Sequence, residues 1–425
     1  MLEKILRTIE KFIPKKIYRF FQPAYHFFLA VLGAIIYRLP GLHLKVVGVT
    51  GTKGKTSTVE LINAILEEAQ YKTAIASTLR FKVGKEEKRN LFKMTMPGRF
   101  FVQKILRQAV NEKCEYAIVE ITSEGAKQFR HLFLSLDALI VTNLSPEHIE
   151  SHGSFEKYKN AKLSIAKELE RSWKRHRFVV VNSDDPHGKD FLNFKIENKS
   201  TFSLKDAEPF ELHEDGIDFT LDGEKINSKL SGEFNLYNIL AAITFAKSQN
   251  INNEVIKRAL EKFEGIRGRV EKIDIGQNFT VVVDYAHTAD SMEKVYKVFE
   301  NHRKICVFGA TGGGRDKWKR PEMGRVADTY CDEIILTDDD SYDENPQEIT
   351  EAIATGIKNR IPTILIDRRE AIREGFKRAK SGDVVLITGK GTDPYLMGPN
   401  GTKIEWDDAT VAREELSKIS HARTS

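Results

Sequence analysis

Residues 48–58 read GVTGTKGKTST, and this stretch decides the fold class. The β-branched run before it, residues 45–49, predicts a strand, and residues 59–69 after it have the apolar spacing of a helix. A glycine-rich turn between a strand and a helix is the setting of a phosphate-binding loop. The usual spacing G-x-x-x-x-G-K-[ST] wants glycine at position 49, where this chain has Val49 and carries Gly48 one place earlier. The stretch therefore predicts an α/β protein with a slightly irregular nucleotide cradle.

Individual residues of this loop have separate expected roles. Gly48, Gly51 and Gly54 let the backbone turn tightly and point its N–H groups at phosphate oxygens. Lys55 reaches the outer phosphates, and the hydroxyl of Thr56 suits Mg²⁺. The competing interpretation, a glycine turn before an ordinary helix, does not account for a lysine and three hydroxyls at these positions. We expect the nucleotide to be bound by Gly51, Thr52, Gly54, Lys55, Thr56 and Ser57.

The length and composition of the chain are those of a multidomain globular protein. Its 425 residues give room for about three domains. The hydrophobic share of 41% and the charged share of 30% are ordinary for a protein with a sizeable core. Cys114, Cys306 and Cys331 are far apart and show no metal-binding or disulfide pattern, which fits a reducing cytosol.

Positive charge is concentrated at the N-terminus. Residues 1–45 hold eight Lys or Arg and two Glu, a balance of +6, so the other 380 residues carry about −1 of the net +5. A nucleic-acid-binding protein spreads basic residues over its folded body, and we therefore expect no nucleic-acid partner.

The first 44 residues read as a separate helical segment. Apolar residues recur at helical spacing from Leu2 to Ile13, and residues 27–37 are apolar throughout. That run is too short to span a bilayer, which needs about 20 residues, and no small-residue cleavage site follows it. Two interpretations of residues 1–40 stay open. They form either an amphipathic segment in the interface of an anionic membrane, or a helical hairpin packed on the protein's own body or on a partner.

Beyond residue 44, strand and helix patterns alternate, which predicts mostly parallel sheets with flanking helices. We expect a central ATP-binding domain over residues 45–265 and a smaller doubly wound domain over residues 266–425. Residues 82–98 are polar and basic and read as a loop. Strands are expected at 45–49, 115–121, 137–143, 177–182, 280–286, 304–310, 333–338, 363–367 and 383–389.

Polar residues at the ends of these strands are candidate ligands, because open parallel sheets bind their ligands there. Glu120 follows a strand and suits Mg²⁺ beside the phosphate loop. Downstream, His148 and His152 lie four residues apart, and Lys162 follows on a helix. Each of these residues, taken alone, is more simply a surface residue.

The second half of the chain supplies further cations. Arg269, Asp284 and His287 lie near strand ends, and the glycine-rich residues 311–324 carry basic side chains that suit an anionic ligand. Those basic residues are Arg315, Lys317, Lys319 and Arg320. Phosphoryl transfer needs a backbone cradle, Mg²⁺ and added cations, and these parts lie on both predicted domains. We therefore expect the active site in a cleft that domain closure completes.

Seven ordered motifs resemble those of the Mur ligases, and the likeness spans residues 45 to about 418. They are GVTGTKGKTST, VEITSEG, TNLSPEHIESHGSFEKYKNAK, GEFNLYN, GRVE, DYAHTADSM and FGATGGGRDKWKRPEMG. The branch that the chain resembles most is MurE, which adds the third amino acid to the UDP-MurNAc dipeptide. The resemblance implies a cytoplasmic, monomeric, ATP-dependent ligase that works through an acyl phosphate. It would add diaminopimelate, lysine or ornithine in peptidoglycan synthesis.

The resemblance also implies roles for individual residues. The catalytic residues would be Lys55, Lys162, His148 and Arg269. Two Mg²⁺ ions would be held by Thr56, Glu120, His148 and a carbamylated Lys162. The adenine, ribose and γ-phosphate of ATP would meet Asn238, Asp284 and Arg269 in turn. The muramyl-peptide and amino-acid substrates would be contacted by Thr95, Thr122, Arg130, Asp339, Asp340, Gly389 and Asp393.

Three departures from the family pattern bear on the substrate. About 44 unrelated residues stand in the place of the N-terminal domain that grips UDP, so the UDP moiety would be held differently, held by a partner, or absent. Where diaminopimelate enzymes carry Asp-Asn-Pro-Arg, residues 339–342 read Asp-Asp-Ser-Tyr, which loses a bidentate grip on a carboxylate. The family's Gly-Lys-Gly-His-Glu appears at 389–393 as Gly-Lys-Gly-Thr-Asp, which keeps an acid on a shorter stem.

Two other functions compete with this interpretation. A folylpolyglutamate synthase-like ligase shares the core fold, but the DYAHT and GGGRDKWKRPEMG motifs favour the MurE branch. A membrane-attached nucleotide-binding module without catalysis predicts the loss of catalytic residues. Lys55, Glu120, His148, Lys162 and Arg269 are all present.

Overall fold

The computed structural model describes residues 15–147, 149–314 and 317–424 of the chain. The fold is α/β, as predicted, with a mostly parallel sheet in each of two compact units.

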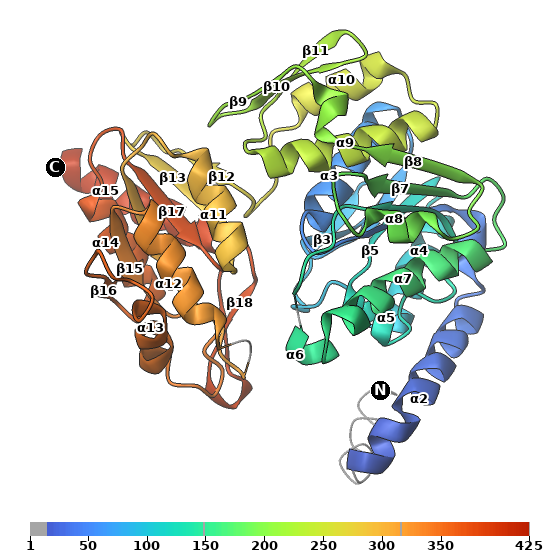
Figure 1. Cartoon of the computed structure of the whole chain (residues 1–425), viewed down its shortest axis with the longest axis horizontal. Helices are drawn as coiled ribbons and strands as arrows, with labels where there is room; N and C mark the ends of the chain where they lie inside the picture. Colours follow the sequence, from blue (N-terminus) through green and yellow to red (C-terminus); the bar gives the residue numbers. More distant parts are fainter. Residues whose placement is uncertain (1–14, 148, 315–316, 425) are drawn as a thin grey trace. The chain divides into compact units, whose positions relative to one another are not determined.

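The two units do not follow the predicted domain limits. Unit 1 runs to Ser203 and includes residues 241–256, whereas unit 2 holds residues 204–240 and those from Lys257 onward (Figure 1). Residues 204–240, which the sequence analysis placed in the central domain, thus group with the second unit. The limits drawn from the sequence stay a prediction.

Unit 1 is built on an eight-stranded sheet in the order β4-β3-β2-β5-β1-β6-β7-β8. The central strand β1, Lys45–Thr50, runs parallel to β5 and β6 on its two sides. Its residues Val46, Val47 and Val49 are fully buried, as a parallel strand covered on both faces requires. The other strands are β2 (Thr73–Ala76), β3 (Arg80–Val83), β4 (Glu86–Arg89), β5 (Tyr116–Glu120), β6 (Leu136–Val141), β7 (Phe178–Asn182) and β8 (Asn198–Phe202).

Helices cover both faces of this sheet. Buried residues of α4 (Arg99–Asn111), α7 (Phe155–Arg171) and α8 (Gly188–Leu192) join one core cluster with the strands. On the other face lie α3 (Lys55–Glu68) and the second half of α9 (Glu233–Ser248) (Figure 1). The remaining helical segments of this unit are α2 (Lys15–Ile36), η1 (Pro40–His43), α5 (Ser123–Lys127) and α6 (Ile149–His152), and α10 (Asn253–Lys262) follows α9.

Unit 2 is a doubly wound sheet in the order β12-β13-β17-β14-β15-β16. All its neighbouring strands are parallel except the pair β12–β13. One core cluster joins the sheet to α11, α12 and α13, and a second joins it to α14 and α15, so helices cover both faces. The strands are β12 (Glu271–Ile273), β13 (Thr280–Asp284), β14 (Lys304–Phe308), β15 (Glu333–Leu336), β16 (Thr363–Ile364) and β17 (Val384–Thr388).

The other elements of unit 2 fall into three groups. The helices are α11 (Ala289–Val298), α12 (Lys319–Tyr330), α13 (Pro346–Ala354), α14 (Arg368–Arg378) and α15 (Asp408–Thr424). A separate antiparallel sheet holds β9 (Phe210–Leu212), β10 (Ile217–Leu221) and β11 (Glu224–Ser228), with η2 (Leu204–Ala207) before it. A hairpin pairs β18 (Tyr395–Met397) with β19 (Lys403–Glu405) around η3 (Pro399–Gly401).

Two predictions from the sequence were wrong. Residues 82–98 are not all loop, because β3 and β4 form an antiparallel hairpin on the edge of the sheet. The four residues of β4 are exposed and charged, so they carry no apolar alternation to reveal a strand. The cysteines were expected to stay apart, yet Cys306 and Cys331 form a disulfide. Cys306 lies in β14 and Cys331 two residues before β15, so the pairing of these strands brings them together.

The N-terminal helix α2 packs on the body of unit 1 along one face. Leu29, Ala30 and Ala34 are buried, and Gly33 lies against the start of α4. The ring of Phe27 lies 6.3 Å from that of Phe129. Helix α2 therefore packs on the protein's own body, and the two interpretations of residues 1–40 stay predictions. The expected periodic residues 2–13 lie outside the described part. Among the described residues, no helix is long and apolar enough to cross a membrane.

Candidate active site

The phosphate-binding loop connects β1 to α3, as predicted. Gly51 and Gly54 have φ values of 150° and 79°, and Gly54 is the left-handed residue before the first turn of α3. A Cβ at Gly51 would lie 1.9 Å from the hydroxyl of Thr142, so this position has no room for a side chain. Gly48, by contrast, lies within β1 and takes no part in the turn.

Residues 142–145, after β6, hold the loop in place. The side-chain oxygen of Asn143 accepts a hydrogen bond of 2.9 Å from the backbone N–H of Lys53. The Thr142 hydroxyl donates to the carbonyl of Lys53 over 2.6 Å. Thr52 is held at 2.9 Å from the hydroxyl of Tyr158 on α7. The cradle is therefore ordered by side chains from two further elements.

A carboxylate and a hydroxyl meet at the C-terminal edge of the sheet. The Thr56 hydroxyl donates to the Oε2 atom of Glu120 over 3.1 Å, and the backbone N–H of Thr78 donates to the same oxygen over 2.9 Å. Glu120 ends β5 beside Val49 of β1, and it is only 2% exposed. Both groups are hard oxygen donors, the kind that Mg²⁺ prefers.

Lys162, on α7, also contacts the loop that connects β1 to α3. Its Nζ atom donates to the carbonyl oxygen of Gly51 over 2.6 Å, and the side chain is 1% exposed. Lys55 donates to that oxygen over 3.0 Å and to the carbonyl of Thr52 over 2.9 Å. Burial, and secondly the charge of Lys55, hold the pKa of Lys162 well below its ordinary value.

The predicted metal ligand His148 lies outside the described residues. His152 is buried, with its Nε2 atom 3.2 Å from the hydroxyl of Ser123. Within the part of the chain that the structure describes, no three His, Cys, Asp or Glu side chains form a metal-binding group. Thr56, Glu120 and Lys162 are therefore the described members of the predicted metal set.

The three residues predicted to contact the muramyl peptide lie near the edge of the sheet where Thr56 meets Glu120. The Thr95 hydroxyl lies 2.8 Å from that of Thr78, the residue whose N–H binds Glu120. Thr122 caps α5 by accepting from the backbone N–H of Gly125 over 3.0 Å. Arg130 donates to the backbone carbonyl of Met96, which follows Thr95 in the chain. Thr78 and Tyr158 were missed from the sequence, although Thr78 follows the short strand β2, where the strand-end rule applies.

Three residues of unit 2 are predicted to contact the nucleotide. Asp284 and Arg269 lie together near the end of β13, and Asn238 lies on α9. Asp284 ends β13, and its two oxygens accept backbone N–H bonds from Val270 and Ala286 at 2.7 and 2.6 Å. Arg269 lies in the turn that Asp284 holds, with its guanidinium 4.4 Å from the ring centre of Tyr285. Asn238 is buried on α9 and donates to the side chain of Asn235 over 3.1 Å.

The residues predicted for the amino acid form a buried ionic cluster. Lys390 lies 2.9 Å from Asp340, 3.2 Å from Asp393 and 3.7 Å from Asp339. Gly389 makes room for the carboxylate of Asp339, because a Cβ there would lie 2.7 Å from its Oδ2 atom. That oxygen is buried and has no hydrogen-bond partner within the described residues.

Protonation in this cluster is shifted by burial and by neighbouring charge. Burial raises the pKa of Asp338 to about 6, and the neighbouring Asp339 adds to the shift. Burial also raises the pKa of Asp339, against the opposing charges of Lys390 and Arg368. Burial alone would lower the pKa of Lys390, but Asp339, Asp393 and Asp340 together raise it. Lys390 therefore stays a cation beside these carboxylates.

The basic residues after the glycine turn do not all face a ligand. Lys317 and Arg320 both pair with Glu344, at 3.2 and 2.9 Å, and the Glu344 carboxylate also accepts from the N–H of Gly314. From the sequence, these basic residues were expected to bind an anionic ligand, whereas Lys317 and Arg320 pair with Glu344 of the protein itself. Arg315 lies outside the described residues.

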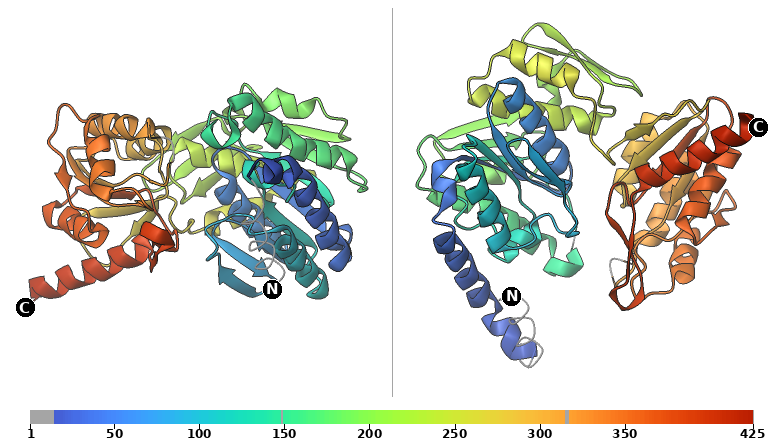
Figure 2. Two further views of the ribbon diagram at one scale, coloured as in Figure 1. Left: turned by 90° about the horizontal axis from the view of Figure 1, so that it is seen from below. Right: turned by 180° about the vertical axis from the view of Figure 1, so that it is seen from behind.

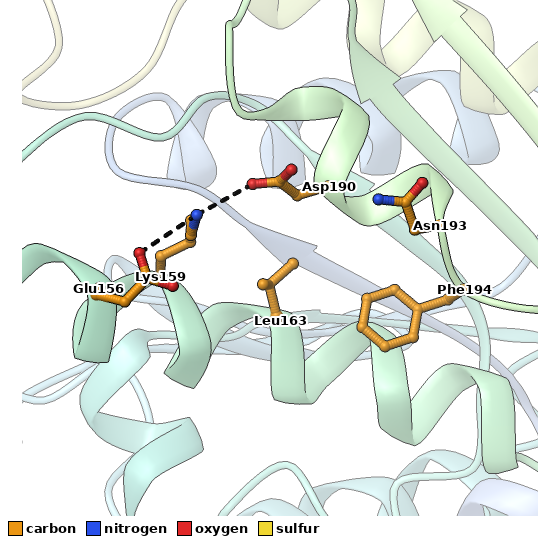
Figure 3. Close-up of a pocket in the computed structure, with 6 residues that line it drawn as sticks. All are labelled: Glu156, Lys159, Leu163, Asp190, Asn193 and Phe194. Carbon is orange, nitrogen blue, oxygen red and sulfur yellow. Dashed lines mark ion pairs between the residues drawn. The ribbon is translucent and has the colours of Figure 1, made fainter.

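A surface hollow of about 310 Å³ lies on unit 1 away from these groups (Figure 3). It is lined by Glu156, Lys159, Leu163, Asp190, Asn193 and Phe194. The amine of Lys159 bridges it by ion pairs of 3.4 Å to Glu156 and 3.3 Å to Asp190. None of the predicted site residues lines the hollow, and we assign it no catalytic role.

Two family models match along the chain. Residues 49–246 match the Mur ligase middle domain, and residues 268–391 match the model named Mur ligase, glutamate ligase domain. The first range contains the phosphate-binding loop, Glu120 and Lys162, and the second contains Arg269 and the ionic cluster up to Gly391.

Curated relatives and solved structures match most of the chain. UDP-N-acetylmuramoyl-L-alanyl-D-glutamate--2,6-diaminopimelate ligase of Syntrophomonas wolfei is 36% identical over 406 residues, which cover 91% of this chain and 81% of that protein. UDP-N-acetylmuramyl-tripeptide synthetase of Roseiflexus sp. is 34% identical, with 92% and 82% covered. A solved structure of a UDP-N-acetylmuramoyl-L-alanyl-D-glutamate--2,6-diaminopimelate ligase is 28% identical. Its TM-score is 0.61, and the match covers 89% of this chain and 79% of that one. Folylpolyglutamate synthase of Mycobacterium tuberculosis has a TM-score of 0.68 over 85% and 91%, but at 13% identity it shows a shared fold alone.

Proposed function

Because this chain belongs to the Mur ligase family, whose members use ATP to form amide bonds, we propose that it extends a muramyl peptide by one amino acid. The acceptor is UDP-N-acetylmuramoyl-L-alanyl-D-glutamate, and the added residue is a diamino acid, diaminopimelate or lysine. Relatives that are 36 and 35% identical over 91 and 92% of the chain are named for the addition of diaminopimelate. The product is a peptidoglycan precursor, so the reaction serves cell-wall biogenesis, cell shape and cell division.

One arrangement in unit 1 carries the catalytic part of this proposal. Thr56 lies against Glu120 at the sheet edge, while Lys55 and Lys162 reach one carbonyl of the loop between them. A binding module without catalysis gains nothing from a buried carboxylate and a buried lysine at this place, because burying charged groups costs free energy. The arrangement thus supports an active enzyme over an inactive module.

The proposed chemistry runs through two transfers. The γ-phosphoryl group of ATP passes to the terminal carboxylate of the muramyl dipeptide, giving ADP and an acyl phosphate. The amine of the incoming amino acid then attacks the acyl carbon, the C–N bond forms, and phosphate leaves as the tetrahedral intermediate collapses. Lys55 and the loop N–H groups stabilise charge on the transferring group. In unit 2 we assign Arg269 to the γ-phosphate, Asp284 to the ribose and Asn238 to the adenine.

The residues at the sheet edge fit Mg²⁺. Glu120 and Thr56 offer a carboxylate and a hydroxyl within 3.1 Å of each other. Bound Mg²⁺ supplies charge neutralisation on the phosphate oxygens. We propose two ions, the second held by His148 and by Lys162 in a carbamylated form.

The surroundings of Lys162 support its carbamylation. The side chain is fully buried, and burial together with the charge of Lys55 lowers the pKa of its amine, which favours the neutral, nucleophilic form. When a neutral amine attacks CO₂, the N–C bond forms, one C=O electron pair moves onto oxygen, and the nitrogen loses a proton. The product is an anion, which the positive charge of Lys55 attracts.

The substrates are assigned to the remaining predicted residues. Thr95, Thr122 and Arg130 contact the muramyl peptide. The incoming amino acid is contacted by Asp339, Asp340, Gly389 and Asp393. Tyr342 stands where diaminopimelate enzymes carry an arginine, so acids outnumber cations around this site, which supports a substrate with a cationic side-chain end.

We further propose that the enzyme works as a monomer in the cytoplasm, where ATP and nucleotide-linked precursors are available. This proposal does not rest on the cysteines, because Cys306 and Cys331 form a disulfide.

Phosphate release tests the proposed function. Purified protein is given ATP, Mg²⁺ and UDP-N-acetylmuramoyl-L-alanyl-D-glutamate with diaminopimelate, lysine or ornithine, and each component is omitted in turn. Release that needs both the dipeptide and one diamino acid is expected. Release that ignores either substrate contradicts the proposal, and release with folate and glutamate instead favours the folylpolyglutamate alternative.

A further inference from the structure

Helix α2 has a second face that its packing on unit 1 leaves open. Phe21, Phe28 and Ile35 follow one another at seven-residue steps, which is two helical turns, and are 59, 63 and 64% exposed. Leu29 and Ala34, on the packed side, are buried. The helix extends away from the sheet of unit 1, with its first turns beyond the other ribbons of that unit (Figures 1 and 2).

Exposed apolar residues are concentrated on α2, with one more, Leu42, in η1. Across the described residues, 15 large hydrophobic side chains are exposed, and six of these lie between residues 21 and 42. The six are Phe21, Phe27, Phe28, Ile35, Ile36 and Leu42. Single exposed hydrophobic residues are ordinary, whereas a contiguous group marks a surface that meets another apolar phase.

The charges within and beside α2 in the sequence are all of one sign. The sequence has no Asp or Glu between Glu10 and Glu60, and no charged residue between Arg19 and Arg38. Lys15, Lys16 and Arg19 precede the uncharged stretch. An apolar helix with basic residues at both ends complements a layer that is apolar inside and anionic at its surface.

The dimensions of α2 fit a helix that lies along such a layer. From residue 21 to residue 36 the helix rises about 22 Å, less than the roughly 30 Å of a hydrocarbon core. Its packed face also stays against α4. A second copy of the chain is a poorer occupant, because pairing two such patches would bring their basic ends together.

We propose that α2 binds unit 1 to an anionic lipid bilayer. Phe21, Phe28 and Ile35 enter the boundary between headgroups and acyl chains, and the flanking basic residues meet the lipid phosphates. The helix lies in the plane of the membrane and serves as a peripheral anchor.

Vesicle flotation of the full-length protein tests this proposal. The protein should float with phosphatidylcholine vesicles that contain phosphatidylglycerol, and not with phosphatidylcholine alone. For the triple variant Phe21→Gln/Phe28→Gln/Ile35→Gln, the ratio of bound to free protein should fall at least about tenfold, since burying even one large apolar side chain is worth about that factor. The variant Lys15→Gln/Lys16→Gln/Arg19→Gln should lose about fivefold per removed charge on the anionic vesicles.

A matched control uses exposed apolar residues of unit 2. The variant Leu212→Gln/Ile361→Gln/Ile404→Gln removes three such side chains and should float like the unaltered protein. Circular dichroism and thermal melting check that every variant is folded. Equal flotation of the α2 triple variant and the unaltered protein, or equal flotation with neutral vesicles, would overturn the proposal. A dimer in lipid-free sedimentation that the α2 triple variant abolishes would also overturn it, since the patch would then join two copies.

Discussion

The amines of Lys55 and Lys162 donate to the same atom, the carbonyl oxygen of Gly51, at 3.0 and 2.6 Å. Two lysines on one acceptor repel each other when both are charged, and Lys162 is the more deeply buried of the two. Lys162 therefore gives up its proton more readily, which is what carbamylation requires. This pair connects the phosphate-binding loop to the chemistry proposed for α7.

Replacing Lys162 tests that connection. Lys162→Ala should lower ligase activity at least about 1,000-fold, or about 4 kcal/mol in the barrier, because the proposed anion is lost. Lys162→Glu restores a carboxylate and should keep part of the activity. Lys159→Ala, one turn earlier, removes only the ion pairs with Glu156 and Asp190 and is the control. With ¹³C-bicarbonate, the unaltered protein should show a carbamate carbon signal that Lys162→Ala lacks, and a signal that persists in this variant assigns the carbamate elsewhere.

Glu120 should set the requirement for Mg²⁺. Glu120→Gln keeps the shape but removes the charge beside Thr56, and we expect kcat/KM to fall at least about 100-fold, or roughly 3 kcal/mol. The Mg²⁺ concentration for half-maximal activity should rise in the same variant. Glu124→Gln changes an exposed acid nearby and should leave the Mg²⁺ titration unchanged. An unaltered titration for Glu120→Gln would remove this residue from the metal site.

Asp338 predicts a dependence of stability on pH. Its pKa of about 6 lies above the ordinary 3.8, so the folded protein holds this proton more tightly than the unfolded chain does. The stability it contributes is fully present below about pH 4 and is lost as the pH rises to about 6, to a limit of about 3 kcal/mol. Asp338→Asn stays neutral and should therefore gain stability over the unaltered protein at pH 7 but not at pH 4. Chemical denaturation at both values measures the difference, and parallel pH curves would count against the shift.

The buried pair of Arg368 and Asp408 should be essential to unit 2. Both side chains are fully buried, and the guanidinium makes two bonds to the carboxylate, at 2.8 and 2.7 Å. Asp408→Ala leaves the arginine buried without its partner and should cost about 3–5 kcal/mol of unfolding free energy. The exposed pair Arg325–Glu322 is the control, and Arg325→Ala should not change stability measurably. A small loss for Asp408→Ala would mean that water reaches Arg368.

The disulfide between Cys306 and Cys331 should stabilise unit 2 and leave catalysis unchanged. It closes a 25-residue separation, and cross-linking a loop of that size stabilises a fold by about 3 kcal/mol in the chain-entropy model. Cys306→Ser/Cys331→Ser should therefore melt at a lower temperature and retain its kcat. Peptide mass mapping without reductant should find the two cysteines linked, and free thiols at both positions would contradict the pairing.

The parallel core was predictable from the sequence because its strands are short, continuous apolar runs. Val46, Val47 and Val49 illustrate this, since a strand covered on both faces needs no polar alternation. The edge hairpin was not predictable on the same grounds, because exposed β4 consists of Glu86, Glu87, Lys88 and Arg89. The short strand β2, of four residues, offers too little pattern to identify.

The part of the site at the ends of β1 and β5 was predictable, because its residues directly follow or end paired parallel strands. Lys55 and Thr56 follow β1 directly, and Glu120 ends the neighbouring strand, so their meeting follows from the parallel pairing. The roles of Lys162 and of the ionic cluster came from the family resemblance, and their contacts depend on tertiary packing. The pairing of Lys317 and Arg320 with Glu344 spans more than 20 residues of chain, and no local pattern reveals it.

The β3–β4 hairpin has a consequence for how this protein behaves at high concentration. Without it, β2 would end the sheet and offer four buried, uncharged residues, Thr73–Ala76, as an open edge. Such an edge is a template for strand addition from a neighbouring molecule. The hairpin instead presents two acids and two bases, all exposed, at the rim. The charged edge strand therefore protects the sheet against fibril-like association. A variant in which residues 80–89 are shortened should be less soluble than the unaltered protein.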